Sequence, residues 1–267
     1  MACIDFPSCW NWLATHLFSV DWGGVGKPLI GTLVGGGIAF YTNWWLQKQT
    51  RTRDDIAAGQ RALFTIRSQF DDFCNCRYGL RVSMARVSNA MSKGPFWLYA
   101  KPIGFHFNAA NVFDFKSLGF LLATEAGMKI YGRLQFLERT YLDFTGRLED
   151  INTSALELQK ESVPVYREKC DVTFEEMENK LGPELIGRTN DQQCAVVLRL
   201  ERDGPRYLKF YAQLNDALAE IFKGEKGFKK LPQLDTVTKF CEDQLPALPG
   251  VFVPYLVSVP VHADDNA

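Results

Sequence analysis

The chain has 267 residues, of which 46% are hydrophobic and 23% are charged, and its formal net charge at pH 7 is -1. This hydrophobic content is too high for a disordered chain, and the length is sufficient for a buried core. Without a basic excess the sequence does not fit a general nucleic-acid binder, because such a protein must neutralise phosphates. The mean hydropathy of -0.14 excludes a protein made mostly of membrane helices.

The first 27 residues form an aromatic tail with tryptophans such as Trp10 and Trp12. This composition predicts a segment that lies on the outer face of a membrane. The alternative is a short ordered tail packed on a partner. Cys3 and Cys9 would lie on the same outer side, where they can form a disulfide.

Residues 28–47 form the longest stretch of the N-terminal region without a formal charge. Twenty helical residues rise about 30 Å, which matches the hydrocarbon core of a bilayer. We therefore predict a transmembrane helix here, with Trp44 and Trp45 at one membrane interface. The alternative is a buried helix of a soluble domain, because four glycines, two threonines and Asn43 dilute its apolar character.

Two features of this predicted span indicate orientation and self-association. Lys48, Arg51 and Arg53 follow it directly, so the Lys/Arg bias predicts a cytoplasmic C-terminal side and an external N-terminus. Gly31 and Gly35 form a G-x-x-x-G pair, which lets two helices approach closely in lipid and predicts a homo-oligomer.

After residue 48 the apolar residues recur at spacings of three and four, which predicts a helix from about 50 to 92 that continues from the span without a hinge. Residues 94–116, with two prolines and alternating aromatics, predict a partly extended crossover. A second, unbroken apolar seam from Ile130 to Leu158 has a period of 3.5 and predicts another long helix.

The remaining chain contains helices punctuated by glycine and proline. Pro164 is predicted to open a third helix that ends at Gly182-Pro183, and Gly204-Pro205 is predicted to kink or break the helix that follows. The expected fold is all-α, with the transmembrane helix followed by an antiparallel cytoplasmic bundle over residues 48–224. Residues 225–267 form a proline-rich tail packed on that bundle.

No catalytic or cofactor motif is recognisable, and the three histidines lack zinc-ligand spacing. We therefore expect no catalytic residues, no metal and no cofactor. The one charged residue of interest is Arg77, which occupies a seam position of the first long helix. It either extends to solvent at the bundle edge or forms a buried ion pair with an acidic partner such as Glu138 or Asp143.

The layout resembles a group of uncharacterised bacterial single-pass inner-membrane proteins. The resemblance rests on the glycine-rich stretch 30–40, the basic junction 47–53, the leucine-rich turn 117–122 and the Gly182-Pro183 junction, and it covers about residues 25–220. It implies the topology given above, and it implies no activity or site.

These observations favour a membrane-anchored, non-enzymatic interaction or scaffold protein that self-associates and presents its bundle to a cytoplasmic protein partner. The alternative, from a different class, is a membrane-permeabilising effector of a phage-defence or toxin system. In that case the cytoplasmic domain senses a signal and the glycine-rich helices open the membrane.

Overall fold

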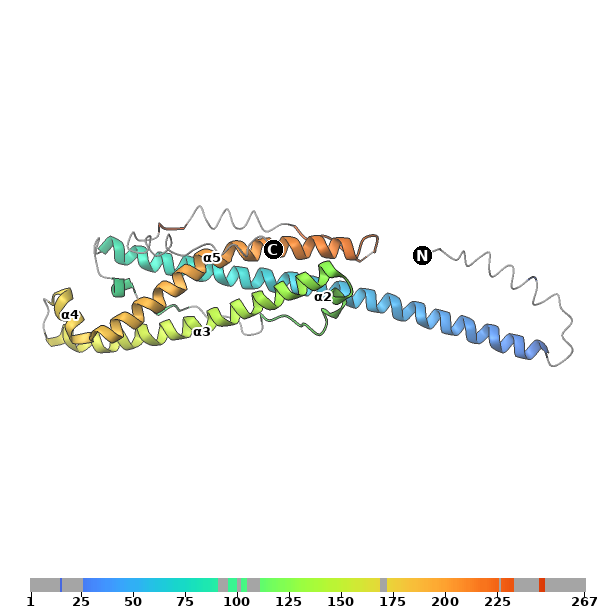
Figure 1. The fold of residues 1–267 in the computed structure, drawn as a ribbon, viewed down its shortest axis with the longest axis horizontal. Helices are drawn as coiled ribbons and strands as arrows, with labels where there is room; N and C mark the ends of the chain where they lie inside the picture. The colour runs from blue at the N-terminus through green and yellow to red at the C-terminus, as the bar shows by residue number, and fades with distance from the viewer. Residues whose placement is uncertain are drawn as a thin grey trace. The chain divides into compact units, whose positions relative to one another are not determined.

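The computed structural model describes residue 15 and residues 26–90, 96–99, 102–104, 111–168, 172–225, 227–232 and 245–247. All regular elements in this part of the chain are helices (Figure 1). The elements are α2 (Gly26–Ala90), η1 (Phe96–Tyr99), η2 (Gly119–Ala123), α3 (Glu125–Glu168), α4 (Phe174–Leu181) and α5 (Pro183–Ile221). The all-α prediction is confirmed.

The chain divides into two compact units, Met1–Asp54 and Asp55–Ala267. The boundary falls within the residue range of α2. Apart from residue 15, the predicted tail over residues 1–25 and its Cys3–Cys9 pair lie outside the described residues.

The core of the second unit follows the two predicted seams. All nine seam residues of α3 from Ile130 to Leu158 are buried. On α2, Phe73 lies at the centre of the core, where its ring stacks on Phe144 of α3 at 4.4 Å between centroids and meets Tyr207 of α5 at 5.0 Å. The heptad-like spacing thus buried one face of each helix, as expected for a bundle.

The helix directions differ from the prediction in one respect. Within the second unit, α5 runs antiparallel to both α2 and α3, whereas α2 and α3 run parallel (Figure 1). The prediction of an antiparallel bundle is therefore wrong for the α2–α3 pair. The reason is the crossover, which returns along the length of the bundle, so that α3 starts again at the end where α2 enters the unit.

The described parts of the crossover are held by hydrogen bonds from the helices beside them. The Asn152 side chain accepts from the Ile103 amide at 2.6 Å and donates to the Ile103 carbonyl at 3.1 Å. Further along, Glu138 accepts from the Phe113 amide at 3.1 Å. Residue 103 thus lies beside 152 and residue 113 beside 138, which shows that this leg runs opposite to α3.

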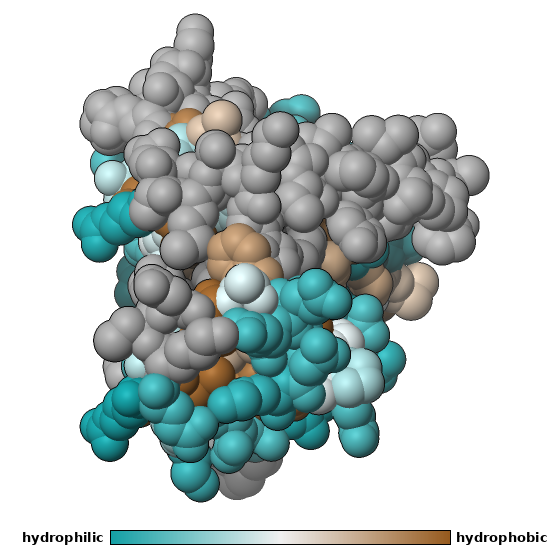
Figure 2. Space-filling view, turned by 90° about the vertical axis from the view of Figure 1, so that its left-hand side faces the viewer, coloured by the Kyte–Doolittle hydropathy of each residue, from teal (hydrophilic) through white to brown (hydrophobic). Residues whose placement is uncertain are grey.

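A second, smaller core lies at the end of the bundle that carries α4. Its buried residues are Trp97, Leu158, Val165, Met177, Leu181 and Leu185. The Trp97 indole donates to Glu178 at 2.9 Å, which ties η1 to α4. Figure 2 views this end, where hydrophilic side chains cover much of the described surface and hydrophobic ones show between them.

Pro164 does not open a helix as predicted, and at Pro205 the helix continues without a break. Pro164 lies inside α3, which ends at Glu168, and Pro205 lies inside α5. The next helix begins only at Phe174, where Thr173 and Glu176 form a reciprocal capping box. Packing along long helices here outweighs the loss of one backbone hydrogen bond at each proline.

The predicted transmembrane helix over residues 28–47 is not supported. Among the residues that the structure describes, no helix has both the length and the apolar character needed to cross a membrane. The length of α2 is sufficient at 65 residues, so the missing property is apolar character. The glycines, threonines, Asn43 and Gln47 lower the mean hydropathy of the stretch.

Candidate interaction segment on α2

The residues predicted to act at a membrane lie on one helical stretch of α2, residues 31–53, which we call the apolar–basic segment. Its large side chains are exposed: Leu33 and Phe40 are about three-quarters exposed, at 74% and 76%, and Trp44 and Trp45 about half, at 49% and 48%. An exposed run of large apolar side chains marks an interaction surface more often than isolated ones do.

Three of the large apolar residues share one side of this segment. At 100° per residue, Leu33, Phe40 and Trp44 project within about 40° of one another, whereas Gly31 and Gly35 lie on the opposite half of the helix. A Cβ built on either glycine meets no atom within 4 Å. The segment therefore presents Leu33, Phe40 and Trp44 on one side and a gap at the two glycines on the other, where Trp45 also projects.

The polar groups of this segment are partly satisfied within the helix. The hydroxyls of Thr42 and Thr50 donate to carbonyl oxygens four residues earlier, at 2.8 and 2.9 Å. Such back-bonding reduces the cost of placing a threonine in a less polar environment. The segment is thus less polar than its composition suggests.

Cations are concentrated at the C-terminal end of the segment. Lys48, Arg51 and Arg53 lie there, and residues 26–53 contain no acidic side chain. The Lys48 ammonium lies 5.6 Å from the centre of the Trp44 ring, which places an aromatic face and a cation side by side. Exposed aromatic rings next to cations are suited to bind a surface that is anionic and partly apolar.

Arg77, by contrast, lies within the second unit and forms an ion pair. Its guanidinium donates to both carboxylate oxygens of Glu201 on α5, with Nε at 3.0 Å from Oε1. Arg81 shares the same carboxylate, with its Nη2 at 2.7 Å from Oε1. The partner therefore differs from the two suggested by the sequence, since Glu138 binds the crossover and Asp143 pairs with Arg199.

Arg77, Arg81 and Glu201 form an ion triad that also contacts the C-terminal tail, because Arg81 donates to the Pro246 carbonyl at 3.1 Å. Burial would raise the pKa of Glu201, but the hydrogen bonds from Arg77 and Arg81 lower it overall. The carboxylate is therefore ionised at neutral pH and fixes the register of α2 against α5. The described tail residues pack here and at Asn215, which exchanges two hydrogen bonds with Leu231.

The sequence pattern gave no indication of one polar cluster, which is centred on Asp72 of α2. The Asp72 carboxylate accepts hydrogen bonds from the Tyr141 hydroxyl at 2.6 Å and from the side-chain amide of Asn111 at 3.0 Å. The side-chain amide of Gln69 donates to the backbone carbonyl of Asn111 at 2.6 Å. Burial and the bond to Asp72 raise the pKa of Tyr141. The phenol stays protonated at neutral pH, and the cluster anchors the crossover against α2 and α3.

No group of side chains in the described ranges is suited to hold a metal ion. The comparisons give no relative from which a role can be transferred: no family model matches the chain, and neither a curated protein nor a solved structure does. The apolar–basic segment is therefore the site whose composition and exposure are most informative about function.

Proposed function

We propose that this protein is a non-enzymatic helical scaffold that attaches to an anionic lipid bilayer through the apolar–basic segment and presents its bundle to a protein partner. The observation that carries the proposal is the exposed large apolar residues at 33–45, followed by the cations Lys48, Arg51 and Arg53 and only then by Asp54 and Asp55. Attachment here means insertion of these apolar residues into the membrane interface.

The charge pattern favours the cytoplasmic face of a membrane, and the resemblance given above suggests a bacterial inner membrane. Anionic lipids attract each nearby cation by about 1 kcal/mol. Lys48, Arg51 and Arg53 together then contribute about 3 kcal/mol, which corresponds to roughly a hundredfold in partition coefficient. Tyr41 and the two adjacent tryptophans suit the headgroup region, where an aromatic ring meets both apolar and polar groups.

Self-association through Gly31 and Gly35 is part of the same proposal. With Leu33, Phe40 and Trp44 in lipid, the turn that carries Gly31 and Gly35 faces away from the membrane and is available to a second copy, and the lack of a side chain at these two positions permits close helix contact there. Gly35→Leu is expected to abolish crosslinked dimers on vesicles while leaving the amount of bound protein unchanged.

The test is co-sedimentation of the full chain with vesicles of phosphatidylcholine alone and with added phosphatidylglycerol. Replacing the three cations by glutamine is expected to weaken binding to the anionic vesicles about a hundredfold, with little change for neutral ones. Replacing Trp44 and Trp45 by alanine is expected to weaken binding to both. Phe136→Ala, at a residue of α3 with 48% exposure, is the matched control and leaves binding unchanged.

Two outcomes would contradict the proposal in different ways. If the protein binds neither vesicle, the apolar–basic segment does not attach to lipid. If bound protein releases a dye trapped in the vesicles, and Gly35→Leu stops the release, the protein is a permeabilising effector and the scaffold role is wrong.

A further inference from the structure

A second row of regularly spaced residues runs along α3, outside the buried seam. Its positions recur every seven residues, at 128, 135, 142, 149, 156 and 163, and we call it the heptad stripe. Four of the six residues are large and apolar, and their exposed fractions lie between 39% and 55%: Met128, Leu142, Leu156 and Val163. A repeat sustained over five heptads is typical of a helix that packs against another helix.

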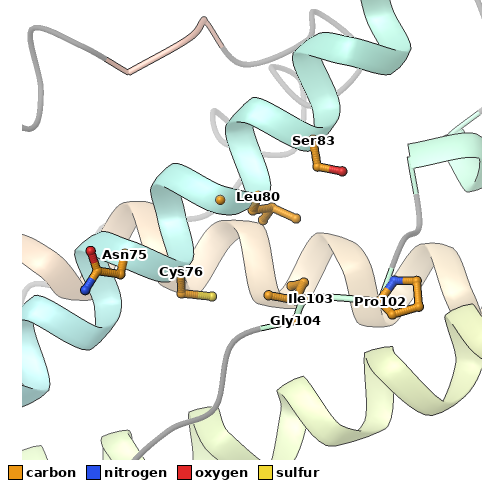
Figure 3. Close-up of a pocket in the computed structure, with 8 residues that line it drawn as sticks. Asn75, Cys76, Leu80, Ser83, Pro102, Ile103 and Gly104 are labelled. Carbon is orange, nitrogen blue, oxygen red and sulfur yellow. The ribbon is translucent and has the colours of Figure 1, made fainter.

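The sides of α3 next to this stripe are occupied by other parts of the second unit. The crossover lies along one of them, where Asn152 exchanges two hydrogen bonds with Ile103. Residues 102–104 also line an open cavity of α2 in which Ile103 lies opposite Cys76 (Figure 3). At 100° per residue the heptad stripe lies between Asn152 and Asp143, which contacts α5. The stripe is therefore the side of α3 on which a further helix can pack.

α5 borders the stripe and runs antiparallel to α3. Three side-chain contacts fix the register of the two helices: Arg133 with Gln213, Asp143 with Arg199, and Glu157 with Arg188. Residues 129–147 of α3 therefore lie beside 199–209 of α5, and 149–161 lie beside 184–191.

The charges along this pair of helices are separated into two halves. Residues 129–147 and 199–209 contain eight basic and four acidic residues, whereas 149–161 and 184–191 contain six acidic and two basic ones. Three of the four acids in the basic half face elsewhere, because Glu138 bonds the crossover, Glu201 bonds α2 and Asp203 is buried. The face formed by α3 and α5 is thus positive at one end and negative at the other.

We propose that a second copy of this chain packs antiparallel on this face, with a two-fold axis near Glu149. Leu142 of each copy then lies opposite Leu156 of the other, and each positive half lies along a negative half. Arg147 of one copy is within a helical turn of Glu149 of the other, so the two Glu149 carboxylates near the axis have counter-charges. A parallel pair would instead place like charges together.

This contact lies wholly in the second unit and does not depend on attachment to lipid. Because the same face is used by both copies, the contact closes into a dimer. Gly146 lies next to Leu142 on the stripe side of α3, and a Cβ built there meets no atom within 4 Å, so the centre of the face leaves room for a second helix.

Sedimentation velocity of the full-length chain in lipid-free buffer measures this association. The wild type is expected to form a dimer that weakens as the salt concentration rises. Leu142→Gln is expected to raise the dimer dissociation constant at least tenfold. Leu122→Gln is the matched control, because Leu122 of η2 has the same exposed fraction of 49%, and it should leave the constant unchanged. A monomeric wild type, or equal effects of the two substitutions, would overturn the proposal.

Charge reversal tests the complementarity of the two halves. Arg139→Glu with Arg147→Glu in one variant, and Asp150→Lys with Glu161→Lys in another, are each expected to weaken the dimer at least tenfold. An equimolar mixture is expected to associate again, because the reversed residues of one variant then oppose those of the other. Recovery also shows that both variants are folded. Both variants keep the apolar–basic segment, so association through that segment would not distinguish the mixture from its components. A mixture that stays monomeric contradicts the proposal.

Cysteine crosslinking tests the orientation of the two copies. In the antiparallel pair, the two copies of residue 142 lie about 20 Å apart along the helix, which is too far for a disulfide. We therefore expect Leu142→Cys to crosslink with Leu156→Cys in a mixture of the two variants, as identified by peptide mass analysis, and not with itself. Glu149→Cys, near the axis, should crosslink with itself. Self-crosslinking of Leu142→Cys would show a parallel pair and would overturn the proposal.

Discussion

The ion triad of Arg77, Arg81 and Glu201 gives the most quantitative prediction for the second unit. The side chains of Glu201 and Arg81 are 15% exposed and that of Arg77 is 24% exposed, so the triad is largely shielded from solvent. Removing one partner of a buried pair costs about 3–5 kcal/mol because the other charge stays behind. With partial exposure here, we expect Glu201→Ala to lower the free energy of unfolding by about 3 kcal/mol.

Urea unfolding followed by circular dichroism measures this loss, and a double-mutant cycle isolates the interaction. For Arg77→Met and Glu201→Gln we expect a coupling free energy of about 1–2 kcal/mol. The control pair is Glu125 with Lys129 on α3, whose side chains are 82% and 68% exposed and whose coupling should stay below about 0.5 kcal/mol. Equal coupling in the two pairs would refute the reasoning.

Three further predictions concern pH, glycines and the buried phenol. Because the pKa of Glu201 is lowered from its ordinary value of 4.5, its contribution is complete above that pH and is lost as the pH falls through the lowered pKa. The difference in free energy of unfolding between wild type and Glu201→Gln should therefore decrease in acid. A difference that stays constant down to about pH 2 contradicts this. Gly127→Ala should lower the free energy of unfolding by about 2 kcal/mol or more in urea, since its Cβ would lie 2.0 Å from the Leu121 carbonyl oxygen. Gly132→Ala, whose Cβ meets no atom, should raise the free energy of unfolding by about 0.5–1 kcal/mol. Tyr141→Phe removes the 2.6 Å bond to a carboxylate and should cost about 1–2 kcal/mol in the same assay.

The long helices were predictable because their signal is local. A helix buries every third or fourth residue, so the apolar spacing alone located the buried faces of α2 and α3. The role of Pro164 was misjudged for the same reason. Local propensity favours a helix boundary at this proline, whereas packing along the whole of α3 overrides it.

The partners of polar residues were not predictable from one sequence. Arg77 was recognised as unusual because a charge interrupted an apolar seam, but its partner Glu201 lies 124 positions away. Asp72 gave no signal, because an acidic pair on a helix is usually solvated and only the crossover brings Asn111 to it. A membrane span was predicted from the lack of charge over residues 28–47, and its glycine and polar content was given too little weight.

The sequence by itself determined the all-α class, the buried faces of the long helices and the composition of the apolar–basic segment, because these depend on residues within a few helical turns. Only the tertiary structure decided the parallel direction of α2 and α3, the assignment of Glu201 to Arg77 and the cavity beside Cys76. Each of these depends on where a crossover without regular periodicity places distant segments. That placement is set by long-range packing and hydrogen bonds, such as those of Asn152 to Ile103.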